Sequence, residues 1–208
     1  MTEAYKTLSK SVCAELTVKR SRFLCYANPV SCEAEAAEFV KEISAKHWDA
    51  RHNVWAYSVR EGRRERYSDD GEPQGTAGQP VLEALRARDI TDAVLVVTRY
   101  FGGILLGASG LTRAYASSAG LGIEQAGTVV MRPSLRLRLV LEYPRFAQFE
   151  RILLRLGGVV ESSEFAQYVT VCFALPADSY EAFRSALAEL VPGAATELLG
   201  EGFTPADL

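Results

Sequence analysis

The chain has few of the residues that would mark a disulfide-bonded or membrane-spanning protein. Only four of its 208 residues are cysteines, and none forms a C-x-x-C pair. We therefore expect reduced thiols rather than disulfides or zinc ligands. The apolar run Ala93–Val97, typical of the longest, falls far short of the ~20 residues that cross a bilayer. Residues 1–10 contain no apolar signal segment, so we expect a cytoplasmic protein with no membrane partner.

Neither sign of charge dominates the composition. The chain has 23 Lys and Arg against 26 Asp and Glu, a net charge of −3. That balance excludes a histone-like polycation and leaves room for a local basic face. With 48% apolar residues the chain can bury a real core, which excludes a disordered protein. Its length favours one large or two small domains.

The character of the sequence changes near Arg132-Pro133-Ser134, where proline restricts the backbone. Most glycines and nearly all unusual polar clusters precede this point, and a plain alternation of short apolar elements follows it. We therefore predict an α+β protein of two domains, residues 1–134 and residues 135–208.

The second part predicts a regular series of elements. Leu135–Leu141 alternates apolar and basic residues as a half-buried strand does. Tyr143–Leu156 has apolar residues at three- and four-residue steps, which indicates an amphipathic helix. Two strands, a helix starting on the cap Asp178 and a last strand are expected next, over Val159–Phe165, Gln167–Leu175, Asp178–Leu190 and Ala195–Leu199. This βαββαβ order is the ferredoxin-like pattern.

The first part also mixes helices and strands. The predicted strands are Glu15–Val18, Ser21–Ala27, His52–Val59 and Ala93–Thr98. The predicted helices are Ser31–Lys46, Pro80–Arg88 and one that starts near Gly107 or Ser109. Between them, Arg60–Gly78 is expected to be a polar loop, of a length that compact domains seldom keep without a use.

A glycine-rich turn, Arg99–Gly110, joins the last of these strands to a helix. Its spacing fits G-x-x-x-x-G-x-S, but Ala108 stands where a phosphate loop needs lysine, which argues against a nucleotide triphosphatase. The absence of G-x-G-x-x-G argues equally against a dinucleotide site. Two interpretations remain: small residues that let the turn pack tightly, or a site for an RNA backbone phosphate helped by Arg99 and Arg113.

An acidic cluster, Ser68–Gly78, contains three carboxylates within four residues: Asp69, Asp70 and Glu72. One interpretation is a shaped loop that closes on a helix, with Thr76 and Gln79 as a capping box. The other is a Mg²⁺ or acid/base site, although the spacing is not that of a calcium loop. We expect no metal and no cofactor.

A third cluster, Asp49-Ala50-Arg51-His52-Asn53, leads into an aromatic-rich strand. His52 has a side chain whose unperturbed pKa of about 6.5 suits a general base. A lone histidine at a strand edge is more often a structural hydrogen-bonding group. No G-x-S-x-G elbow accompanies it, so a catalytic triad has little support.

Basic residues also lie beside aromatic ones in several segments of the first part. Arginine binds phosphates and exposed aromatic faces stack on unpaired bases. These segments could converge on one nucleic-acid-binding face, or their charges could be paired with nearby acids. The basic residues and the aromatics near them are Lys19, Arg20, Arg22 and Phe23; Arg51, Trp55 and Tyr57; Arg63, Arg64, Arg66 and Tyr67; Arg99, Tyr100 and Phe101; Arg113 and Tyr115.

Four of these motifs together resemble the YigZ/IMPACT family in order and spacing, and the resemblance covers nearly the whole chain. The motifs are Lys19-Arg20-Ser21-Arg22-Phe23, Asp49-Ala50-Arg51-His52, the Ser68–Gly78 cluster and the Arg99–Gly107 turn continuing through Gly110–Tyr115. The resemblance implies an N-terminal domain like domain 2 of ribosomal protein S5 and a C-terminal domain like one of elongation factor G. Its eukaryotic member acts in translational control by competing for the activator of a starvation-response kinase. Bacterial members have no firmly assigned reaction.

We therefore expect a non-enzymatic protein linked to translation, whose partner is RNA, the ribosome or a translation factor. The residues predicted to contact phosphate are Arg20, Arg22, Arg51, Arg99, Gly102, Gly103, Gly107 and Arg113. The alternative is a hydrolase-type enzyme with an acid/base or Mg²⁺ site built from His52, Asp69, Asp70 and Glu72.

Overall fold

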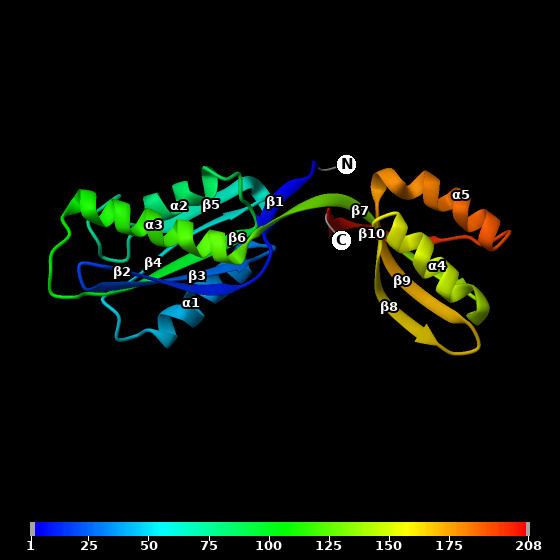
Figure 1. Cartoon of the computed structure of the whole chain (residues 1–208), viewed down its shortest axis with the longest axis horizontal. Coiled ribbons are helices and arrows are strands. Elements are labelled where there is room, and N and C mark those ends of the chain that lie inside the picture. The colour runs from blue at the N-terminus through cyan, green and yellow to red at the C-terminus, as the bar shows by residue number, and fades with distance from the viewer. Residues whose placement is uncertain (1–2, 207–208) are drawn as a thin grey trace. The chain divides into compact units, whose positions relative to one another are not determined.

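The computed structural model describes residues 3–206, which divide into two compact units (Figure 1). The N-terminal unit comprises Tyr5–Val129, and the C-terminal unit comprises residues 130–206 with residues 3–4. Both contain helices and sheets, so the α+β class is confirmed. No helix among residues 3–206 is long and apolar enough to span a bilayer. The four cysteines are all free thiols, as predicted.

The N-terminal unit contains a five-stranded antiparallel sheet in the order β2-β3-β6-β4-β5. Its strands are β2 (Val12–Val18), β3 (Ser21–Pro29), β4 (His52–Val59), β5 (Arg64–Ser68) and β6 (Ala93–Tyr100), and a short strand β1 (Tyr5–Leu8) precedes them. Its helices are α1 (Glu33–Lys46), α2 (Gly78–Arg86) and α3 (Ala108–Ala126). Helices α2 and α3 cover one face of the sheet and α1 covers the other (Figure 1).

Alternation along each strand explains this three-layer arrangement. In β6, Leu95 and Val97 pack toward α2 and α3, whereas Val94 and Val96 pack toward α1. Because successive side chains of a strand point to opposite faces, an unbroken apolar run suits a strand with helices on both sides. The sequence interpretation of Ala93–Thr98 as a fully buried strand is thus confirmed.

The predicted polar loop Arg60–Gly78 is partly wrong. Its first half forms a 3₁₀ turn η1 (Glu61–Arg63) and the edge strand β5, which pairs with β4. The strand lacks an apolar alternation because four of its five residues are exposed. Apart from Arg60, the residues of the predicted loop that remain without regular structure are 69–77.

The C-terminal unit has the predicted ferredoxin-like topology. Its elements are β7 (Thr128–Leu141), α4 (Tyr143–Arg155), β8 (Val159–Phe165), β9 (Val169–Pro176), a 3₁₀ turn η2 (Ala177–Ser179), α5 (Tyr180–Leu190) and β10 (Glu197–Pro205). Strand β10 pairs with β7, β7 with β9 and β9 with β8, all antiparallel. One face of this sheet packs on α4 and α5 around Phe149, Phe173 and Phe183.

The predicted joint at Pro133 lies inside β7, where Pro133 is the register partner of Phe203 in β10 and precedes the segment Ser134–Leu141 that pairs with β9. One local expectation fails in this unit. Asp178 does not cap α5, which begins after the 3₁₀ turn with Ser179 at the N-cap and no side-chain hydrogen bond there.

Candidate functional site

Several of the predicted motifs meet at one end of the N-terminal sheet. The β2–β3 hairpin turns at Lys19 and Arg20, and the start of β4 lies beside the end of β6, where His52 is paired with Arg99. Strand β5 ends opposite Trp55, so the loop of residues 69–77 starts at the same end. Antiparallel pairing alone therefore brings these distant parts of the sequence together.

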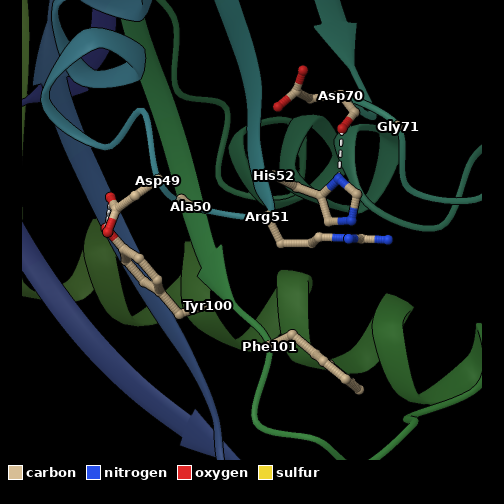
Figure 2. A pocket seen from close by; sticks show the side chains of 8 residues that line it. All are labelled: Asp49, Ala50, Arg51, His52, Asp70, Gly71, Tyr100 and Phe101. Carbon is tan, nitrogen blue, oxygen red and sulfur yellow. Dashed lines mark hydrogen bonds between the residues drawn. The ribbon is translucent and has the colours of Figure 1, made fainter.

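A pocket of about 720 Å³ opens at this end. Its lining consists of Asp49, Ala50, Arg51, His52, Asp70, Gly71, Tyr100 and Phe101. Figure 2 shows Arg51, His52 and Phe101 pointing to one side of the β6 ribbon, with Asp49 and Tyr100 on the other side. The pocket therefore joins the third sequence cluster, the acidic loop and the start of the glycine-rich turn.

His52 is held between the acidic loop and the interior. Its Nδ1 donates to the carbonyl oxygen of Asp70 at 2.7 Å, a contact drawn in Figure 2. Its Nε2 lies 3.8 Å from Oε1 of Glu72, beyond hydrogen-bond distance. The ring is thus anchored by the backbone of the loop and lies above a buried carboxylate.

Beneath the pocket lies a buried ion pair between Glu72 and Arg99. Their side chains are 4% and 6% exposed, and Nη1 of Arg99 donates to Oε1 of Glu72 at 2.5 Å. The hydroxyl of Tyr115 on α3 donates to the same oxygen at 2.8 Å. Burial raises the pKa of Tyr115, and the charge of Glu72 raises it further, so this phenol remains a neutral donor.

Aromatic rings flank the buried guanidinium. Cζ of Arg99 lies 5.6 Å from the ring centroid of Phe23 and 5.6 Å from that of Phe101. Nε of Arg99 is buried and has no hydrogen-bond partner among the described residues. Arg99 therefore ties the acidic loop to the sheet and does not act as the exposed phosphate contact that the sequence predicted.

The other two carboxylates of the acidic loop satisfy backbone groups. Asp69 accepts hydrogen bonds from the N–H groups of Gly75, Ala77 and Gly78 at 2.8–3.0 Å. Asp69 thus supplies the N-terminal cap of α2 that the sequence assigned to Thr76. The predicted capping box is wrong because the Thr76 hydroxyl donates instead to the carbonyl of Pro73.

Asp70 accepts from the N–H of Asn53 at 2.6 Å, and Gly71 follows it with a positive φ. The four acid/base candidates therefore do not form one cluster: His52 lies beside Glu72, whereas Asp69 and Asp70 bind backbone amides. Within residues 3–206 no three His, Cys, Asp or Glu side chains come close enough to hold a metal ion.

The five predicted phosphate-binding arginines fall into two groups. Arg22 pairs with Glu15 through two hydrogen bonds of 2.8 and 3.2 Å, and Arg99 is buried, so the prediction fails for these two as free cations. Arg20, Arg51 and Arg113 are exposed, and no ion pair or hydrogen bond of their side chains is formed among residues 3–206. No contact places Arg113 in the pocket.

The three predicted glycines differ in what they do. A Cβ on Gly102 would lie 2.0 Å from the carbonyl carbon of Arg20, so this glycine permits close approach to the hairpin turn. Its N–H donates to the hydroxyl of Ser21 at 3.2 Å, which corrects the expectation that it faces a ligand. Gly103 and Gly107 have φ of 83° and 73°, and open space lies around both.

Sequence reasoning missed a second polar network on the α1 side of the sheet. The Tyr26 hydroxyl lies 2.6 Å from Nε2 of His47, and Nδ1 of His47 lies 2.9 Å from the Tyr100 hydroxyl. Tyr100 in turn donates to Asp49 at 3.0 Å. Burial lowers the pKa of His47 and the charge of Lys46 lowers it further. The sequence carried no signal for this network, because Tyr26 and Tyr100 lie on different strands and meet His47 only in the fold.

Together, the fold and this end of the sheet define a two-domain α+β protein with a pocket built from loops on its N-terminal unit. A family model described as the Impact N-terminal domain matches residues 19–123, and a domain of unknown function (DUF1949) matches residues 139–194. The chain belongs to the IMPACT family, as its motifs indicated.

The relatives include proteins matched over most of their length. The IMPACT family member YvyE of Bacillus subtilis is 39% identical, with 81% of each chain covered, and YigZ of Escherichia coli is 34% identical over 85% of this chain and 88% of its own. Protein IMPACT of Rattus norvegicus is 31% identical over 45% of this chain and 31% of its own. A solved structure described as a hypothetical protein is 32% identical, with a TM-score of 0.63 and coverage of 96% and 98%.

Proposed function

We propose that this protein binds RNA through the pocket end of its N-terminal unit, as a non-enzymatic factor in translation. The observation that carries the proposal is the arrangement of charge at this end. Lys19, Arg20 and Arg51 are exposed and form no ion pair among the described residues. Guanidinium and ammonium groups that are free at a surface are available to phosphates.

The acids at the same end are already engaged. Glu72 is buried against Arg99, Asp69 holds three backbone amides, Asp70 holds the amide of Asn53 and Asp49 accepts from Tyr100. Arg99 neutralises Glu72, whereas hydrogen bonds from neutral donors leave the aspartates charged. The cations that this end offers to a phosphate are therefore the side chains of Lys19, Arg20 and Arg51, unpaired within residues 3–206, and not a uniformly cationic surface.

The translational part of the proposal rests on membership of the IMPACT family, whose eukaryotic member the resemblance links to translational control. RNA of the ribosome, or RNA bound to the ribosome, takes part in translation and offers phosphates to the exposed lysine and arginine side chains. It is therefore the partner that we propose. Binding to a translation-factor protein is the competing outcome, and the following experiment separates the two.

The test is a fluorescence anisotropy titration of the full chain with labelled single-stranded RNA at several salt concentrations. Binding that uses phosphate contacts loses affinity linearly in a plot of log K against log salt, with a slope of about −0.7 for each contact. Arg20→Ala with Arg51→Ala should weaken binding and make that slope shallower by about 0.7 for each arginine that is replaced. Arg155→Ala, which removes an exposed arginine from α4 of the other unit, is the matched control and should change neither.

Absence of binding by the wild-type protein, or binding that is insensitive to salt, would refute the proposal. Capture of translation factors from ribonuclease-treated lysate, without RNA affinity of the purified chain, would favour the protein partner instead.

A further inference from the structure

We propose that the pocket binds one unpaired nucleotide of single-stranded RNA, with the base on Phe101 and the phosphate on Arg51. This inference rests on the proposed RNA-binding function and adds the class of RNA that is recognised. It predicts a preference for single strands over duplexes that charge alone would not give.

The size of the pocket suits such a ligand. Its volume of about 720 Å³ lies in the range of small-molecule sites, roughly 300–1,000 Å³, and has room for a base, a sugar and a phosphate. In a duplex the bases are stacked and their faces are covered, whereas single strands can splay a base out onto a side chain. Occupancy of the pocket by a base therefore requires an unpaired nucleotide.

Phe101 provides the surface for the base. Phe101 is 49% exposed as a residue, whereas Phe23, the other ring beside Arg99, is fully buried. The Arg99 guanidinium lies 5.6 Å from the Phe101 centroid and holds the ring from the interior. A ring fixed on one side and open on the other can stack with any base, because every base has a π face.

Arg51 provides the contact for the phosphate. Its backbone N–H donates to the carbonyl of Arg99 at 3.0 Å, which fixes the position of its Cα, and its exposed side chain has no partner among residues 3–206. Figure 2 shows the side chains of Arg51 and Phe101 extending to the same side of the β6 ribbon. One nucleotide can thus contact both.

The remaining charges orient the ligand. Asp49 and Asp70 also line the pocket, and their carboxylates repel a phosphate placed near them. Asp49 lies on the other side of the β6 ribbon from Arg51 (Figure 2), so a phosphate is disfavoured on the Asp49 side and has its cation on the Arg51 side. Asp70 lies beside His52, and its carboxylate accepts from the N–H of Asn53. A free phosphate gains little here, because it lacks the base that contacts Phe101.

The experiment compares two RNAs on the full chain by fluorescence anisotropy at one salt concentration. One is a labelled oligonucleotide of about 12 nucleotides, within the span of single-strand sites, and the other is the same strand annealed to its complement. The single strand should bind more tightly. Phe101→Leu, which keeps an apolar side chain and removes the π face, should weaken single-strand binding about tenfold and leave duplex binding unchanged.

Three controls accompany this comparison. Phe101→Tyr should retain the affinity because it retains the ring. Phe165→Leu removes an exposed phenylalanine of the C-terminal unit and should change nothing. Tryptophan fluorescence during thermal unfolding verifies that each Phe101 variant is folded, because both tryptophans, Trp48 and Trp55, lie in the N-terminal unit.

The outcomes separate this inference from the function on which it rests. Equal affinity for both RNAs, or no loss with Phe101→Leu, overturns the nucleotide pocket and leaves salt-dependent RNA binding intact. Competition by inorganic phosphate as effective as that by a mononucleotide also overturns it. Failure of the wild-type protein to bind either RNA overturns both proposals.

Discussion

The two units of this protein differ in how many polar side chains they bury and in how many of their residues have a positive φ. The C-terminal unit has an apolar core of leucines, valines and phenylalanines, and among its described residues only Ser134 and Thr204 are buried polar side chains. The N-terminal unit buries nine polar or charged side chains, Glu72 and Arg99 among them. All six non-glycine residues with positive φ in the described chain also lie there.

Such departures have a cost in stability. A positive φ at a non-glycine residue costs roughly 1–2 kcal/mol, and a buried ion pair loses the solvation of two charges. Proteins generally break local rules of this kind at functional sites. Three of the six positive-φ residues, Lys19, Arg20 and Asp70, lie at the pocket end together with the buried Glu72–Arg99 pair. We infer that this end is one place where the N-terminal unit loses stability, and three changes test that inference.

The largest effect is expected from Glu72→Ala, because it leaves Arg99 buried without its counter-charge. Removal of one partner of a buried pair costs about 3–5 kcal/mol of unfolding free energy. Urea unfolding followed by tryptophan fluorescence measures this in the N-terminal unit alone, where both tryptophans lie. Glu15→Ala removes the partner of exposed Arg22 and is the matched control, with no measurable shift expected. Equal effects of the two variants would contradict the assigned role of the buried pair.

A smaller effect is expected from Gly102→Ala, compared with Gly103→Ala. The first places a Cβ within 2.0 Å of the Arg20 carbonyl carbon, a clash with backbone that we expect to cost about 3 kcal/mol. The second meets no atom within 4 Å and bears only the cost of its positive φ, about 1 kcal/mol. The same fluorescence-detected unfolding measures both. If Gly103→Ala were the more damaging, the hairpin contact would not be what requires glycine here.

The smallest effect concerns pH and His47. Burial lowers the pKa of this imidazole below its usual 6.5, so the unfolded chain takes up a proton more readily than the folded unit. Its contribution to stability is complete above pH 6.5 and is lost as the pH falls through the folded pKa. His47→Phe should flatten the fall in stability below pH 6.5.

The chain contains two histidines, so proton NMR of the ring signals, assigned with His52→Gln, gives the pKa directly. A folded pKa of His47 at or above 6.5 would contradict this account.

Periodicity alone was enough to predict most of the fold. The alternation of Leu135–Leu141 and the apolar run of Ala93–Thr98 identified one half-buried and one fully buried strand, and the order of the later elements gave the ferredoxin-like topology. Strand β5 was not predicted, because an exposed edge strand has no apolar face that periodicity could reveal. Its identity comes from pairing with β4, which is a tertiary property.

The site was predicted less well, for a reason specific to charged residues. A motif shows that Arg22, Arg99 and Arg51 are arginines, and it does not show which has an acid within reach. Strand register brings Glu15 to Arg22, and the course of the acidic loop brings Glu72 to Arg99. Of the three arginines, Arg51 alone has no ion pair among the described residues. Asp69 was similarly interpreted as part of a Mg²⁺ or acid/base site, although it accepts a hydrogen bond from a backbone N–H of its own loop, that of Gly75.

The hairpin turn at Lys19 and Arg20 has a practical consequence. Both residues have positive φ, 45° and 68°, in a two-residue turn that most proteins build from Asn-Gly. An engineer who optimised this hairpin for thermostability would replace both residues, and would remove two outward cations in the same step. Consensus-style stabilisation of this chain should therefore spare the turn, because the substitutions that improve its melting temperature are the ones that erase its surface charge.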